Sequence, residues 1–377
     1  MELEGRVELV VDWDGRAIVR ASVRSRRAQV AARLLRGLPP DAAAARVPLV
    51  FSLCARAQAL AARLALLQAQ GQTMEADERR RRDVAVAAET VHEALWRMLR
   101  DWPEWLGEAA ATAAMVTMRR ALEPLLRGRA EVVTAAPEAA THCRGLLEEI
   151  VLGEPLAAWR ARADSAGGLA QWAETGATSA ARLVAAAADL PTAPAPRCLP
   201  ASGAANFVER LAERIDDEAF AAAPDWDGLP AETGVAQRQA TLLKHGGAAA
   251  RLLARIADAA RAIDALAALS SDSSHGSAAR SVGDFASEVA NDSRGRGWAL
   301  VDTARGQLLH VAAVAEGVTS FYRIVAPTEW NFHPQGALPG LLVGAPAASR
   351  VAAERLGVLA IQALDPCVTH HVEVVNA

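Results

Sequence analysis

Alternating apolar and polar residues occupy positions 3–24, on both sides of the pair Asp14-Gly15. An Asp-Gly pair between two alternating segments is typical of a tight β-hairpin, which we predict at this position. Residues 29–36 carry apolar side chains at helical spacing, and Gly37 and Pro39-Pro40 follow them. Glycine just past a helix and proline beyond it are common stop signals, so we expect a short helix after the hairpin.

Helical spacing then continues through most of the chain. Residues 55–70, 247–269 and 347–363 are rich in alanine and leucine, which favour helices. Residues 298–324 return to short alternating segments, which predicts a small antiparallel sheet. The pattern therefore predicts an α+β fold, mainly α-helical, with small β elements towards the N- and C-terminal ends. We expect one domain over residues 1–377, made of a hairpin (1–24), a helical body (25–290), and a C-terminal sheet with a cysteine motif (297–377).

Composition and charge exclude several classes of protein. The chain has 377 residues and 39.6 kDa, which is enough for a large core, and alanine supplies most of its 52% hydrophobic fraction. A formal charge of -4 gives no reason to expect nucleic acid or an anionic membrane as a partner. No apolar run is long enough to span a bilayer, and the first residues lack the features of a signal peptide. We expect a cytoplasmic protein without membrane insertion.

The four cysteines are too few and too scattered for a disulfide framework in a chain of this length, so they should be thiols or metal ligands. Cys54 comes directly before the helix predicted from residue 55. The N–H groups and dipole at a helix N-terminus favour a thiolate. A small buried side chain without chemistry is the alternative, and the position alone leaves both open.

The C-terminal segment carries the richest chemistry of the chain. It contains Arg305, the pair Pro327-Thr328, and the closing sequence Asp365-Pro366-Cys367. An arginine, a Pro-Thr turn and a cysteine are the ingredients of a metal pocket lined for anions. We take Cys367 as the centre of a candidate site and Cys54 as its partner, with a structural salt bridge as the alternative role for Arg305.

Several segments, in this order, resemble the large subunit of nickel-iron hydrogenases. Glu4-Gly5 followed by the hairpin is similar to the family's opening motif, and residues 48–62 to its first cysteine motif. The later matches are Thr303-Ala304-Arg305-Gly306 with His310, then residues 326–331, then Asp365-Pro366-Cys367. The resemblance covers the two ends of the chain, and residues 64–227 show none.

Two departures from the family pattern bear on function. Each family cysteine motif is Cys-x-x-Cys and holds nickel, but the second cysteines are replaced here by Ala57 and His370. One thiolate per motif cannot form a four-sulfur nickel site, so we expect no nickel and no hydrogenase activity. The resemblance implies that the iron end is kept. Arg305, Pro327 and Thr328 would then contact cyanide and carbonyl ligands, while Cys54 and Cys367 bind the iron.

A pocket for iron without nickel resembles the accessory paralogue of the large subunit, the HoxV/HupK type. This implies a maturation scaffold, not an enzyme, that binds an Fe(CN)2(CO) fragment transiently and passes it to the precursor of the hydrogenase large subunit. Its partners would be that precursor and the maturation proteins that build and deliver the fragment. His370 is a possible metal ligand or proton carrier, and Glu4 a possible proton relay. The alternatives are a docking module without metal for maturation partners, and a residual redox or hydrogen-sensing enzyme.

Overall fold

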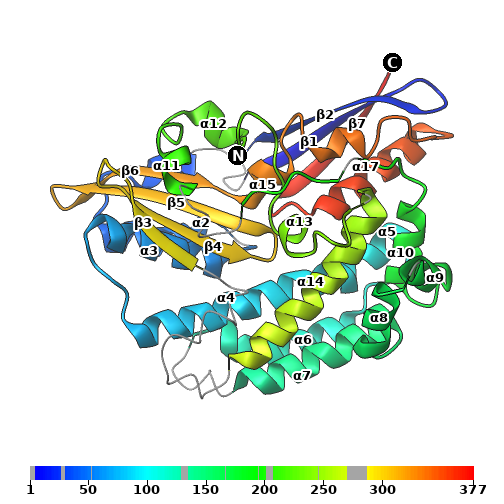
Figure 1. The fold of residues 1–377 in the computed structure, drawn as a ribbon, viewed down its shortest axis with the longest axis horizontal. Coiled ribbons are helices and arrows are strands. Elements are labelled where there is room, and N and C mark those ends of the chain that lie inside the picture. The colour runs from blue at the N-terminus through cyan, green and yellow to red at the C-terminus, as the bar shows by residue number, and fades with distance from the viewer. Residues whose placement is uncertain are drawn as a thin grey trace.

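The computed structural model describes residues 5–26, 30–51, 53–128, 135–165, 167–193, 195–200, 207–244, 246–269 and 287–377. Figure 1 shows long helices running side by side across the lower half of the molecule, with two β-sheets above them. The predicted α+β fold with mainly helical structure is confirmed.

The helices and strands have the following bounds: β1 Arg6–Trp13, β2 Ile18–Arg26, α1 Val30–Leu35, α2 Pro40–Val50, α3 Ala55–Ala69, α4 Ala76–Trp96, η1 Arg97–Asp101, α5 Trp102–Leu106, α6 Thr112–Leu126, α7 Ala136–Leu146, η3 Leu147–Leu152, α8 Leu156–Ala163, α9 Gly168–Glu174, α10 Ser179–Ala187, α11 Phe207–Ala212, α12 Glu218–Ala222, α13 Val235–Arg238, α14 Ala248–Ala268, β3 Ser287–Asn291, β4 Gly297–Thr303, β5 Gly306–Ala315, β6 Val318–Val325, α15 Pro327–Asn331, α16 Ala337–Gly340, α17 Arg350–Leu364 and β7 Thr369–Asn376.

The smaller sheet joins the two ends of the described chain. Its strand order is β2-β1-β7, and the predicted hairpin of β1 and β2 is confirmed. Strand β7 lies parallel to β1, with partners running from Arg6 and Thr369 to Trp13 and Asn376. Val7, Leu9 and Val11 alternate along β1 and are fully buried. This alternation fixes the register, because a shift by one residue would turn these side chains out of the core.

The larger sheet is an antiparallel meander in the order β3-β4-β5-β6, as predicted from the alternating pattern. It begins at Ser287, inside the segment 25–290 that we had assigned to the helical body. Helix α3 packs against β4 and β5. Close packing is possible because β4 starts with Gly297, where a side chain would overlap the backbone of α3.

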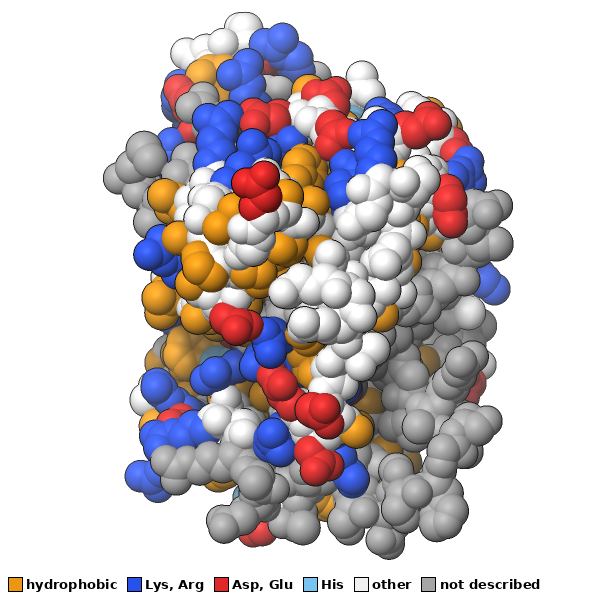
Figure 2. All heavy atoms as spheres, turned by 90° about the vertical axis from the view of Figure 1, so that its left-hand side faces the viewer, with side chains coloured by type: hydrophobic (Ala, Val, Ile, Leu, Met, Phe, Trp, Pro, Cys, Tyr) orange, Lys and Arg blue, Asp and Glu red, His pale blue; other side chains and the backbone are white. Residues whose placement is uncertain are grey.

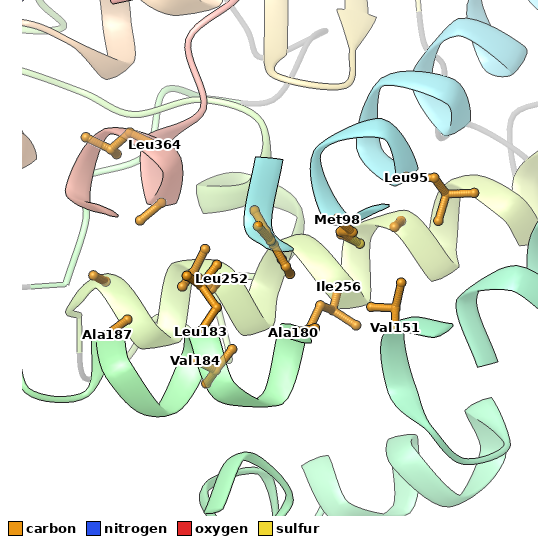
Figure 3. Packing of buried hydrophobic residues seen from close by; sticks show 14 of the residues in the cluster. Leu95, Met98, Val151, Ala180, Leu183, Val184, Ala187, Leu252, Ile256 and Leu364 are labelled. Carbon is orange, nitrogen blue, oxygen red and sulfur yellow. The ribbon is translucent and has the colours of Figure 1, made fainter. Parts of the chain in front are cut away.

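The main core lies between the long helices and extends to α17 and the smaller sheet. Figure 3 shows buried side chains that meet from α4, η1, η3, α10, α14 and α17. Those labelled are Leu95, Met98, Val151, Ala180, Leu183, Val184, Ala187, Leu252, Ile256 and Leu364. Small alanine side chains on α10 and α14 allow these helices to approach closely. The alanine-rich composition therefore favours tight helix packing.

The surface carries mixed charge. On the face drawn in Figure 2, basic and acidic side chains lie side by side among apolar and uncharged ones. Ion pairs on the described surface include Arg33–Glu218 and Arg214–Asp225. Among the described helices, none has both the length and the apolar character needed to cross a membrane.

Candidate functional site

Two cysteines from distant parts of the chain lie near one arginine. Cys54 is the N-cap residue of α3, and Cys367 lies between α17 and β7. Arg305 lies in the tight turn between β4 and β5. The sulfurs of both cysteines are close enough to the guanidinium of Arg305 to contribute to a raised pKa of that group. The structure thus brings together the three residues that the sequence singled out.

Arg305 is 3% exposed and is held by two buried carboxylates. Its Nη2 donates to Glu93 Oε2 at 3.1 Å, and its Nε lies 3.4 Å from Asp365 Oδ1. Burial alone would lower the pKa of Arg305, but Asp365 and Glu93 raise it above its ordinary value, with smaller contributions from the two cysteines. The side chain is therefore a permanent cation at the centre of the site.

Asp365, directly before Pro366-Cys367 in the chain, forms ion pairs with three arginines. Besides Arg305, it pairs with Arg97 at 2.9 Å and with Arg255 at 3.1 Å. Burial would raise the pKa of Asp365, but these arginines hold it below its ordinary value. The backbone of Asp365 has φ +52°, a left-handed conformation that ends α17. The ion pairs thereby fix the direction in which the chain leaves α17 towards Cys367.

A π-helical turn places Arg97 in this cluster. The turn η1 follows α4 without a break and has the π-helical pattern of hydrogen bonds, between residues i and i+5. Arg97, at its start, also donates to the carbonyl of Pro366 at 3.1 Å. Single π-turns within helices are frequent at functional sites because they redirect side chains. Here the turn directs an arginine at the cysteine motif.

Cys367 is 6% exposed and is held by Thr328. Thr328 Oγ1 lies 3.0 Å from Cys367 Sγ and accepts the backbone N–H of Cys367 at 3.2 Å. Pro327 is the first residue of the short helix α15, where its missing N–H costs nothing. The Pro327-Thr328 pair singled out in the sequence therefore lies next to Cys367.

A loop from the middle of the chain supports the turn that carries Arg305. Asn331 donates to the carbonyl of Arg305 at 3.2 Å and accepts the N–H of Thr233 at 2.8 Å. Gly234 and Gly306 bring the two backbones into direct contact. A side chain at Gly234 would overlap the carbonyl of Arg305, and one at Gly306 would overlap Thr233. Both positions therefore require glycine.

The N–H groups in the first turn of α3 are bonded to a carboxylate from α4. Glu89 of α4 accepts the N–H groups of Arg56 and Ala57 at 2.8 and 2.9 Å. Cys54 does lie at the helix N-terminus as predicted, but two of the N–H groups that would favour a thiolate there are bonded to Glu89. The Cys54 sulfur accepts a hydrogen bond from the side-chain amide of Gln58, whose Nε2 lies 3.6 Å from Sγ. The sulfur is half-buried, whereas Cys367 is buried.

The buried carboxyl of Glu89 gives a pH-dependent prediction. Burial raises its pKa from 4.5 to about 7 against the two N–H groups that lower it. The folded chain therefore favours the neutral form, whose stabilising contribution is complete below pH 4.5 and is lost as the pH rises through about 7. We expect the unfolding free energy of the wild type, relative to Glu89→Gln, to fall by roughly 3 kcal/mol across this range. Urea titrations of both proteins at several pH values measure this difference.

Glu123→Gln is the control for that experiment. Glu123 is exposed on α6, and its hydrogen bond with Arg127 lowers its pKa. The corresponding difference should be small and of opposite sign, because this carboxylate loses its contribution as the pH falls. A difference for Glu89→Gln that does not change with pH would contradict the assignment.

The remaining candidate residues are His370 and Glu4. His370 is exposed on β7, at a cavity of about 280 Å³ lined also by η1, α5 and α17. Arg97 and Asp365 line the same cavity, which therefore borders the charged cluster. Glu4 lies outside the described residues. In the described part of the chain, no three His, Cys, Asp or Glu side chains come together as a metal-binding group.

Sequence reasoning missed the residues that surround the cysteines. Glu89 and Glu93 lie four residues apart on an otherwise apolar face of α4, and this spacing was a readable signal for two buried carboxylates. Asp365 was identified only as part of its motif. Gln58 lies one turn after Cys54, and nothing in the local sequence marks it as a partner of the sulfur.

The chain is similar to known hydrogenase proteins. The family of nickel-dependent hydrogenases matches residues 226–372. Hydrogenase expression/formation protein HupV of Azotobacter chroococcum is 32% identical over 390 residues, covering 100% of both chains. HoxV of Cupriavidus necator is 32% identical and covers 92% of this chain and 91% of its own. HupK of Rhizobium leguminosarum bv. viciae is 32% identical, with coverages of 94% and 93%.

Solved structures show the same fold. The Ni-Fe-Se hydrogenase from D. vulgaris Hildenborough aligns with a TM-score of 0.63 and 14% identity, covering 97% of this chain and 96% of that chain. An NAD+-reducing [NiFe]-hydrogenase aligns with a TM-score of 0.57 and 13% identity, covering 95% and 94%. At these identities the likeness concerns the fold.

Proposed function

We propose a scaffold role in hydrogenase maturation for this chain, which belongs to the HoxV/HupK family of hydrogenase expression/formation proteins. Its cargo would be an Fe(CN)2(CO) fragment, held by Cys54 and Cys367 and passed to the precursor of the large subunit. The observation that carries this proposal is that the buried guanidinium of Arg305 lies within electrostatic range of both cysteine sulfurs, one of which also contacts the Thr328 hydroxyl. Thiolates suit low-spin iron, and a buried cation suits cyanide ligands.

The contacts of Arg305 leave room for such a ligand. Within the described residues, its ion pairs involve Nε and Nη2. A guanidinium has five N–H donors, so the two on Nη1 remain for an anionic ligand. Thr328 supplies a hydroxyl next to Cys367. Two protein thiolates would bring an iron that arrives with three diatomic ligands to five ligands, without nickel.

Infrared spectroscopy tests the proposal, since cyanide and carbonyl ligands have stretching bands clear of protein absorption. We expect these bands, together with bound iron, in protein purified without oxygen after co-expression with the hydrogenase maturation proteins. Cys54→Ala and Cys367→Ala should each lose the bands. Cys143→Ala and Cys198→Ala are the matched controls, because Cys143 lies in α7 within the main core and the Cys198 sulfur contacts the carbonyl of Ala236. Both control variants should keep the bands.

Transfer is tested with the loaded protein and a large-subunit precursor that lacks iron. The bands should leave the scaffold and appear on the precursor after the two are separated. A folded wild type that contains neither iron nor bands after co-expression would refute the scaffold role. It would favour the second candidate, a docking module without metal for maturation partners.

A further inference from the structure

Three fully buried polar side chains form a line that ends at Cys54. Tyr322 and His310 lie on neighbouring strands, with 2.8 Å between the Tyr322 hydroxyl and His310 Nδ1. His310 Nε2 lies 2.8 Å from Gln58 Oε1, and Gln58 Nε2 lies 3.6 Å from Cys54 Sγ. All three side chains are 0% exposed. We call Tyr322, His310 and Gln58 the buried relay.

The surroundings of the buried relay are apolar. It lies between α3 and the larger sheet, in a core formed by side chains such as Leu60, Val301, Leu308 and Ile324. Burying three polar groups in such a core costs free energy unless each is hydrogen-bonded. Leucine or phenylalanine at these positions would pack without that cost. The feature that the polar residues provide, and apolar ones would not, is a donor at Cys54.

The chemistry of the four groups fixes the direction of the hydrogen bonds. A thiolate accepts and cannot donate, so the Gln58 amide must turn its Nε2–H towards Cys54 and its Oε1 towards His310. Oε1 accepts only, so His310 must carry its proton on Nε2. Nδ1 of the neutral ring then accepts from the Tyr322 hydroxyl. Burial raises the pKa of Tyr322, which keeps the phenol protonated as the donor at the start of the line.

We propose that the buried relay positions the Gln58 amide as a fixed hydrogen-bond donor to Cys54 and so tunes the bond between this sulfur and the iron cargo. This inference rests on the proposed scaffold function. A donor at a thiolate stabilises the charged sulfur and withdraws electron density from its bond to a metal. Gln58, His310 and Tyr322 are positioning residues, and Thr328 is the corresponding donor for Cys367.

The inference predicts that a change at Tyr322 affects Cys54, although His310 and Gln58 lie between them in the line of hydrogen bonds. In Tyr322→Phe, the His310 ring loses the hydrogen bond that holds it in place. The Gln58 amide that bonds to this ring is then positioned less firmly, and its hydrogen bond to Cys54 is weakened. Gln58→Leu removes the same donor directly. Both changes should shift the carbonyl band to lower wavenumber, because the sulfur gives more electron density to the iron.

Thr319→Val is the matched control. Thr319 is fully buried on β6, the same strand as Tyr322, and is not part of the buried relay. This variant should leave the carbonyl and cyanide bands in place. If Gln58→Leu does not fold, Tyr322→Phe still decides the question, since it changes only one hydroxyl.

A second measurement needs no iron. We expect Cys54 in metal-free protein to be alkylated by iodoacetamide severalfold more slowly in Gln58→Leu and Tyr322→Phe than in the wild type, at one fixed pH. Cys198 in the same chain serves as the internal reference, read by mass spectrometry. If the wild type shows no bands but the alkylation rates differ, the scaffold function fails and the buried relay stands. Unchanged rates overturn the relay, as do unchanged bands in a loaded protein.

Discussion

Replacing Gly234 with alanine is expected to destabilise the fold by about 3 kcal/mol or more, because a methyl group there would overlap the backbone of Arg305. Gly234 also has φ +75° and ψ -118°, a conformation that other residues rarely adopt. Neither backbone can move aside easily, since Asn331 ties them together. Urea unfolding measures the loss of stability, and the shifted turn should also reduce iron loading.

Gly317→Ala is the control that distinguishes the cost of steric overlap from the cost of a positive φ. Gly317 has φ +78° in the turn between β5 and β6, and a side chain there would meet nothing within 4 Å. This control should cost only about 1–2 kcal/mol, the penalty of a left-handed alanine. Equal losses in the two variants would show that the contact between Gly234 and Arg305 is not under steric constraint.

Arg305→Leu should cost about 3–5 kcal/mol, because it removes the guanidinium that pairs with the buried carboxylate of Glu93. Asp365 loses one of three such partners and keeps Arg97 and Arg255. Chemical denaturation measures the change. Adding Glu93→Gln to this variant should recover part of the lost stability, since the buried carboxylate that lost its guanidinium is then replaced by a neutral amide.

Arg33→Leu is the surface control for that experiment. Arg33 pairs with Glu218, but the two side chains are 64% and 50% exposed. Exposed pairs contribute little, so we expect a change below about 1 kcal/mol. A loss of similar size in both variants would mean that the buried position of Arg305 has no special energetic role.

The sequence predicted those parts of the fold that depend on local pattern. The Asp14-Gly15 hairpin, the alternating strands of the larger sheet and the last helix follow from residue spacing alone. Cys54, Arg305, Thr328 and Cys367 were found because short motifs carried them. The structure places all four at one centre.

The surrounding shell could not be predicted in the same way. Glu93 reaches Arg305 across 212 positions of the chain, and His310 reaches Gln58 across 252. These residues become partners because α3 and α4 pack against the larger sheet. A short stretch of sequence carries no information about that packing. The Cys54 case shows the risk of local reasoning, because the helix N-terminus was read correctly while its donors belong to Glu89.

The parallel pairing of β1 with β7 has a consequence for the timing of assembly. β7 begins two residues after Cys367, and its partner β1 precedes Cys54 in the chain. During synthesis, Cys54 leaves the ribosome long before Cys367, and Thr328 and Arg305 leave it in between. Contacts between distant segments form late in folding, since the intervening chain must first be ordered. Both sulfurs are available together only after Cys367 has been made, so a ligand shared by the two can be held in full only from that point on.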